Sequence, residues 1–158
     1  MRFKPQARFK KVTDITPEFL LGANLKGLIL DLDNTLITLD REPIDGIEEW
    51  IKTIKKANIK VCICTNTWRN KNASKIARKL GIPYVKFSQK PSSYGLSKAI
   101  EKLGLKPEEI AEAGDKVLTD VWGANRLGMY SILTEPASNT KNIFERMNRR
   151  LEKWLLNR

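Results

Sequence analysis

The stretch GLILDLDNTL, at residues 27–36, decides the fold of this chain. Its apolar part, GLILDL at 27–32, is too short for a helix but suits a strand that is buried on both faces. Such strands are typical of parallel sheets covered by helices, whose ligands lie at the carboxyl ends of the strands. We therefore expect Asp31 and Asp33, which end this strand, to lie at a ligand-binding edge.

Helical and strand patterns alternate along the rest of the chain. Apolar spacing predicts helices within residues 16–22, 45–58, 73–80, 96–103 and 118–127, and short apolar runs predict strands at 60–65, 84–87, 110–114 and 130–134. This order is typical of a three-layer α/β fold, in which a mainly parallel five-stranded sheet lies between helices. We expect residues 1–158 to form one domain, because this length suits a single core.

The composition restricts both the chemistry and the location. The chain has no histidine, which excludes Ser/His and Cys/His nucleophile pairs and zinc sites with imidazole ligands. The only two cysteines, Cys62 and Cys64, lie on one face of an expected buried strand and should pack as apolar groups. No apolar stretch approaches the roughly 20 residues of a spanning helix, and no secretory signal is visible, which predicts a cytoplasmic protein.

The positive charge is concentrated at the two ends of the chain. The net charge is +11, to which residues 1–12 contribute +5, residues 141–158 contribute +4 and the 128 residues between them only +2. Basic segments of this kind attract polyanions and anionic surfaces. We therefore interpret the N-terminal segment 1–12 and the C-terminal segment 140–158 as a docking surface.

Polar side chains follow the ends of the predicted strands and should meet at one edge of the sheet. They are Asp31, Asp33, Thr65, Asn66, Lys90, Asp115 and Asp120. Acids gathered this closely repel one another and need a cation among them to stay ionised together, and oxygen ligands favour Mg²⁺. The expected ligands are Asp31, the backbone carbonyl of Asp33, Asp115 and, directly or in the outer coordination sphere, Asp120.

Phosphoryl transfer gives the same group of residues a division of labour. It requires a nucleophile, a proton donor for the leaving oxygen and positive charge around the phosphoryl oxygens. Asp31 is the expected nucleophile, and Asp33, two residues further on, the expected general acid and base. Thr65, Asn66 and Lys90 are expected to bind the phosphoryl oxygens.

These residues fall into four motifs that resemble those of haloacid dehalogenase-type phosphatases. The motifs are DLDNTL at 31–36, CTN at 64–66, KP at 90–91 and GDKVLTD at 114–120. Their order and their positions near strand ends make the resemblance specific. It implies a Rossmann-like domain of subclass IIIA and a magnesium-dependent phosphomonoester hydrolase that works through an aspartyl-phosphate.

A finer resemblance covers nearly the whole chain. GDKVLTDVWGANRLGMYSIL at 114–133 and NIFERMNRRLEKWLL at 142–156 resemble the YqeG family, which includes phosphatidylglycerophosphate phosphatases of fungal mitochondria and plants. The family implies dephosphorylation of an anionic phospholipid headgroup at a membrane surface. Lys116 departs from the glutamine that this family usually carries; it either alters the contact with metal or substrate or turns to solvent.

The spacing of the motifs leaves no room for a large cap domain. Between Asp33 and Thr65 there is room for one helix, and between Thr65 and Lys90 for one helix and a short strand. Caps enclose small substrates in this superfamily, so an open site favours a large or anchored substrate. A phosphorylated lipid, a protein and a nucleic-acid end all qualify.

The expected C-terminal helix has an apolar stripe beside a basic face. Four apolar residues share the stripe: Phe144, Met147, Leu151 and Trp154. Four basic residues lie largely elsewhere: Arg146, Arg149, Arg150 and Lys153. A basic amphipathic helix with tryptophan is typical of peripheral contact with an anionic membrane, and packing of the stripe on the domain's own core is the alternative.

Other functions remain open at this stage. A receiver domain also gathers aspartates, a Thr and a Lys around magnesium, but its phosphorylated aspartate ends a later strand. The charge also permits a non-catalytic scaffold that binds polyanions, although no nucleic-acid-binding module is visible. Trp68 and Arg69, which follow the second motif, are expected either at the mouth of the site or in solvent.

Overall fold

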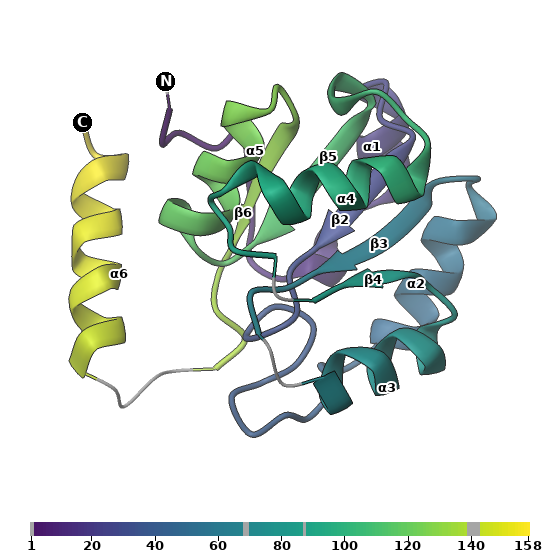
Figure 1. Ribbon diagram of the computed structural model, residues 1–158, viewed down its shortest axis with the longest axis horizontal. Coiled ribbons are helices and arrows are strands. Elements are labelled where there is room, and N and C mark those ends of the chain that lie inside the picture. Colours follow the sequence, from purple (N-terminus) through teal and green to yellow (C-terminus); the bar gives the residue numbers. More distant parts are fainter. Residues whose placement is uncertain (1, 68–69, 87, 139–142) are drawn as a thin grey trace.

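Six parallel strands form one sheet in the computed structural model of the protein (Figure 1). The structure describes residues 2–67, 70–86, 88–138 and 143–158, with only the backbone described for 70–72 and 143–145. The strand order is β1-β6-β5-β2-β3-β4. The chain runs outward from β2 to β4 and then returns to β5 on the other side of β2, so the order reverses between β2 and β5, where α/β folds bind ligands.

The elements follow the alternation that the sequence predicts. The strands are β1 (Ala7–Phe9), β2 (Gly27–Leu30), β3 (Lys60–Cys64), β4 (Tyr84–Val85), β5 (Ile110–Gly114) and β6 (Tyr130–Thr134). The helices are α1 (Pro17–Gly22), α2 (Ile47–Lys56), α3 (Asn70–Leu80), α4 (Ser93–Leu103), α5 (Trp122–Arg126) and α6 (Ile143–Leu156). A π-helical turn, η3 (Val117–Val121), precedes α5.

Helices cover both faces of the sheet. Successive residues of a strand point to opposite faces, so Leu28 and Leu30 pack in one apolar cluster with α1, α2 and α3, whereas Ile29 packs in another with α4 and α5. All three side chains are fully buried. The predicted three-layer α/β fold is confirmed.

The sheet has one strand more than the five that the sequence predicts. β1 pairs in parallel with β6, which brings Ala7 opposite Ile132 and Phe9 opposite Thr134. Part of the basic segment 1–12 is therefore an edge strand. The strand escapes prediction because it is only three residues long and only half-buried.

The apolar stripe of α6 faces away from the core. Met147, Leu151 and Trp154 are 60%, 46% and 50% exposed, whereas Glu152 on another face of the helix is buried. Packing of the stripe on the domain's own core is therefore wrong for these three residues, and the side chain of Phe144 lies outside the described residues. Within the described part of the chain, no helix is both long and apolar enough to cross a membrane.

We predict that Gly95→Ala destabilises the fold. A Cβ at Gly95, in the first turn of α4, would lie 2.2 Å from Cβ and 2.3 Å from Cα of Ser88. Alanine favours a helix by about 1 kcal/mol, but this overlap should lower the free energy of unfolding by about 1–3 kcal/mol. Gly22→Ala, where no atom lies within 4 Å of the added Cβ, is the matched control. Equal stability of both variants in denaturant titrations would contradict the packing.

Candidate active site

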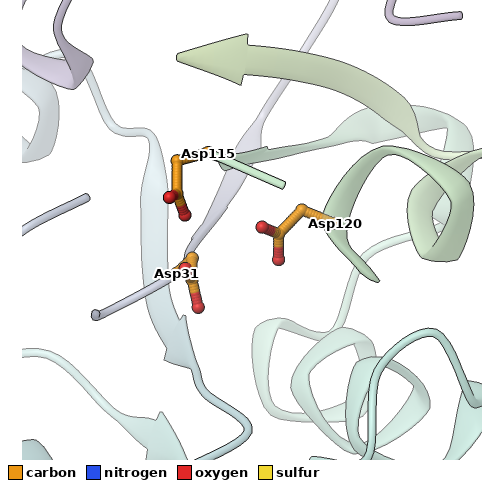
Figure 2. Close-up of side chains that lie close together, drawn as sticks. All are labelled: Asp31, Asp115 and Asp120. Atoms are coloured by element: carbon orange, nitrogen blue, oxygen red, sulfur yellow. The ribbon is translucent and has the colours of Figure 1, made fainter. Parts of the chain in front are cut away.

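Three buried aspartates meet at the carboxyl ends of neighbouring strands (Figure 2). Asp31 follows β2, Asp115 follows β5, and Asp120 lies in η3. One carboxylate oxygen of each lies within 4.8 Å of the corresponding oxygens of the other two, and the residues are 7%, 2% and 1% exposed. The structure thus brings together three of the predicted acids at the point where the strand order reverses.

The ammonium group of Lys90 lies among these carboxylates. Its Nζ is 3.1 Å from Asp31 Oδ1 and 2.6 Å from Asp120 Oδ1. The loop that carries Lys90 is held by Asn66, whose Oδ1 accepts a hydrogen bond from Lys90 N at 2.7 Å and whose Nδ2 donates to Lys90 O at 3.0 Å. The Asn66 side chain therefore positions the loop of the lysine in this structure.

Glu112 is a member of the cluster that the sequence analysis did not identify. It lies in the middle of β5, is 1% exposed, and has Oε1 3.4 Å from Lys90 Nζ. Within the described residues neither of its carboxylate oxygens makes a hydrogen bond. A buried acid is unfavourable unless it is paired. The glutamate in the otherwise apolar strand IAEAG was therefore the sequence signal for a buried basic partner.

Arg149 joins the site from the C-terminal helix. Its guanidinium group donates hydrogen bonds to the backbone carbonyl and to Oδ2 of Asp115. Nearby, Glu152 Oε1 accepts a hydrogen bond from Leu118 N at 3.4 Å, which joins α6 to η3. No sequence signal distinguishes Arg149 from the other basic residues of α6, because its partner is 34 residues away along the chain.

The pKa values of the acidic groups reflect their burial. Burial raises the pKa of Asp31 to about 6, although the charge of Lys90 opposes this shift. Burial also raises the pKa of Asp115 and of Asp120, and neighbouring carboxylates add to the effect. Burial acts to lower the pKa of Lys90, but the charges of Asp120, Asp31 and Glu112 outweigh it and raise that pKa well above its ordinary value.

The charge balance and the ligand types of the cluster fit a divalent cation. Five buried acids face two basic groups, so the fully ionised cluster has three uncompensated negative charges. The acids are Asp31, Glu112, Asp115, Asp120 and Glu152, and the basic groups are those of Lys90 and Arg149. Carboxylate oxygens are the ligands that Mg²⁺ prefers, and three of these acids converge closely enough to bind one ion.

Small residues hold the three aspartates in place. Thr35 Oγ1 lies 3.5 Å from Asp31 Oδ2 and 3.4 Å from Asp115 Oδ1, so this hydroxyl spans two acids. Gly114 allows Asp120 to approach, because a Cβ at this position would lie 2.3 Å from Asp120 Cγ. The glycine of the GD motif is therefore a steric requirement of the cluster.

Of the remaining predicted residues, Asp33 and Thr65 follow β2 and β3, and two others lie outside the described residues. Asp33 is exposed. Partial removal of its carboxyl group from water raises its pKa, and the charge of Lys116 acts in the opposite direction. Thr65 is 1% exposed, and its Oγ1 accepts a hydrogen bond from the backbone two residues on. Trp68 and Arg69 lie outside the described residues.

Comparison with known proteins identifies the class. The family model of haloacid dehalogenase-like hydrolases matches residues 37–128. The chain is 36% identical to "Probable phosphatase YqeG" of Bacillus subtilis (strain 168) over 98% of its own length and 90% of the relative. It is therefore a member of the haloacid dehalogenase-like hydrolases, within which it is similar to a phosphatase over almost its whole length.

Two further matches extend the comparison. The chain is 28% identical to "Phosphatidylglycerophosphate phosphatase 1, chloroplastic/mitochondrial" of Arabidopsis thaliana, over 98% of its own length but 47% of that protein. The cobalt-bound deoxy-D-mannose-octulosonate 8-phosphate phosphatase of Haemophilus influenzae superposes with a TM-score of 0.52, at 17% identity, over 85% of this chain and 89% of that one. This structural match supports the fold.

Removal of the divalent cation should make the protein less stable as the pH rises. In the metal-free fold the pKa of Asp31 is raised from 3.8 to about 6. The contribution of this carboxyl group to the free energy of unfolding is therefore complete below about pH 4 and is lost as the pH rises through about 6. Because Mg²⁺ binds ionised carboxylates, a hundredfold excess over its Kd should raise the Tm by roughly 5–10 °C at pH 8 and far less at pH 4. Thermal unfolding in EDTA and in Mg²⁺ measures both effects. The same Tm at pH 8 with and without Mg²⁺ would contradict the metal site.

Proposed function

We propose that the protein is a magnesium-dependent phosphomonoesterase that forms a covalent aspartyl-phosphate on Asp31. The observation that carries this proposal is the buried convergence of Asp31, Asp115 and Asp120 around Lys90. Asp31, Asp115, Asp120 and the backbone carbonyl of Asp33 would hold the ion. A bound Mg²⁺ would supply positive charge to the phosphoryl oxygens.

In the first half of the reaction Asp31 attacks the substrate. A carboxylate oxygen of Asp31 forms a bond to phosphorus, and the ester bond to the leaving oxygen breaks. Asp33, which is exposed beside the cluster, gives its proton to that leaving oxygen. Lys90 keeps Asp31 ionised through their 3.1 Å contact and balances charge on the phosphoryl group.

In the second half a water molecule releases the phosphate. Asp33, now a carboxylate, takes a proton from the water as the water oxygen bonds to phosphorus. The bond between phosphorus and Asp31 breaks, which regenerates the carboxylate and frees inorganic phosphate. The access of Asp33 to solvent suits this exchange of protons, whereas the burial of Asp31 protects the nucleophile.

The Asp31→Asn variant should lose phosphate release by more than about a thousandfold, because an amide is not a nucleophile of this kind. Its Tm should not fall, since the substitution removes an ionisable group from a buried cluster. Asp40→Asn, which changes an exposed aspartate, is the matched control and should keep its activity. Phosphate release from p-nitrophenyl phosphate with and without Mg²⁺ measures the effect, and an active Asp31→Asn variant would contradict the mechanism.

The proposed substrate is phosphatidylglycerophosphate, which would be converted to phosphatidylglycerol. The name of the Arabidopsis relative supports this substrate, and so does the brevity of the segments after Asp33 and Thr65, which hold α2 and α3. The alternatives are another phosphorylated molecule, such as a protein, a nucleotide or a nucleic-acid end, and a non-catalytic scaffold. Cleavage of p-nitrophenyl phosphate but not of the lipid would favour the first alternative, and binding without cleavage the second.

We also propose that the outer face of α6 docks on an anionic membrane. Its exposed stripe, Met147, Leu151 and Trp154, presents apolar surface to solvent, and Arg150 and Lys153 are exposed beside it. Apolar side chains with tryptophan enter the interfacial region, and each nearby basic residue contributes about 1 kcal/mol on an anionic surface. The surface would bring the site to a lipid substrate.

Substitution of Leu151 by serine should weaken binding to vesicles that contain phosphatidylglycerol by about tenfold, because the apolar side chain no longer leaves water. Leu21→Ser changes a leucine of α1 that is 51% exposed and is the matched control. Sedimentation with phosphatidylglycerol and with phosphatidylcholine vesicles, at low and high salt, measures the affinity. Equal binding of wild type and Leu151→Ser would overturn the docking surface.

A further inference from the structure

A cavity of about 400 Å³ lies between α6 and the ends of β1 and β6. It reaches Asp115, so it adjoins the carboxylate cluster directly. Phe9, Leu133 and Leu156 contribute apolar surface to its lining. Its volume falls in the range of roughly 300–1,000 Å³ that is usual for small-molecule sites, and its lining combines apolar surface with charged and polar side chains.

Thr134, at the end of β6, is the polar group that suggests a ligand. Thr134 is 3% exposed and lines the cavity, and within the described residues its Oγ1 has no hydrogen-bond partner. A buried hydroxyl without a partner is unfavourable, so it is rare in a folded protein unless a ligand or a water satisfies it. The hydroxyl is available to donate to an oxygen atom bound in the cavity.

The charges around the cavity favour an anion with an apolar extension. Arg8, Lys10 and Lys153 are exposed on its lining. Two of its acids, Asp115 and Glu152, contact Arg149, which leaves Glu135 as the exposed acid. A phosphodiester with attached acyl chains combines the two properties that this lining offers.

We infer that this cavity binds the phosphodiester and the first part of the acyl chains of a phospholipid substrate, with Thr134 donating a hydrogen bond to the phosphodiester. The inference rests on the proposed function. Phosphatidylglycerophosphate has a monoester phosphate and a diester phosphate on the two ends of one glycerol unit. With the monoester phosphate at Asp31, the diester phosphate must lie outside the carboxylate cluster. The cavity begins at Asp115 and so offers a place for it.

A second cavity beside the cluster is less suitable for an anion. It has a volume of about 460 Å³ and reaches Thr35. Its lining includes three acids, Glu42, Asp45 and Glu135, against two lysines. Carboxylates so placed repel a phosphodiester, and the lining includes no buried side chain whose oxygen lacks a partner within the described residues.

The test uses dihexanoylphosphatidylglycerol below its micelle concentration as the probe, with the full chain and Mg²⁺. This molecule has the phosphodiester and two acyl chains but no monoester, so its binding does not depend on turnover. We expect saturable binding by calorimetry, with methyl resonances of Leu133 and Leu156 shifted on addition of the probe. Glycerol 3-phosphate, which has a phosphate but no acyl chain, should leave these resonances unchanged.

Two variants with matched controls test the contacts. Thr134→Val preserves shape and removes the hydroxyl, so it should weaken binding of the probe by about three- to tenfold while thermal stability stays equal or rises. Thr53→Val, on α2, is its control. Leu156→Glu places a carboxylate in the cavity and should weaken binding by more than about tenfold, whereas Leu21→Glu on α1 should not.

The outcomes separate this inference from the proposed function. Cleavage of phosphatidylglycerophosphate without binding of the probe at Leu133 and Leu156 would overturn the cavity assignment and leave the phosphatase intact. Probe binding that Thr134→Val and Leu156→Glu both weaken would support the cavity even if the phosphorylated lipid were not cleaved. Shifts of the same resonances by glycerol 3-phosphate alone would show a general anion site and overturn the phospholipid assignment.

Discussion

The mutual repulsion of buried carboxylates is the constraint on which this structure depends. Five acids are buried together, and the chain supplies Lys90 and Arg149 against them. Burial of unpaired charge is among the most unfavourable terms in folding, so the cluster is stable only with its bases and a cation, or with some of its acids protonated. The pKa of Asp31, raised to about 6, results from the same opposition between burial, which raises it, and the charge of Lys90, which lowers it. The same positive charge that balances the acids also stabilises the negative charge of a phosphoryl group, which favours phosphoryl transfer.

Most of the fold and the centre of the site could be predicted because their signals are local. A strand that ends on an acid, as GLILD does, identifies the element and the position of Asp31 at once. Glu112 and Arg149 were missed because their roles depend on partners far away in the sequence, Lys90 and Asp115. The edge strand β1 was missed for a related reason, since three residues carry too little periodicity and their pairing with β6 is a long-range contact.

Helix α6 illustrates how a periodic pattern leaves its meaning open. The spacing of Met147, Leu151 and Trp154 defines a stripe but not its neighbour, and an apolar stripe usually faces the core. Here polar contacts decide the orientation, because Arg149 and Glu152 bind Asp115 and the backbone of η3 and so hold the opposite side of the helix against the domain. The stripe is left facing solvent as a consequence of ion pairing at the site.

A site without a cap domain, as the spacing of the motifs predicts for this chain, must obtain by other means what a cap would provide. Closure over a substrate expels water and fixes the reacting groups, and both effects lower the barrier of reaction. In this protein α6 links three features: its outer stripe, the cavity that reaches Asp115, and Asp115 itself through Arg149. A lipid that enters from a membrane surface along this route would arrive with its orientation restricted by the bilayer and by the cavity. Docking would then take the place of enclosure, and a freely diffusing phosphomonoester would lack that advantage.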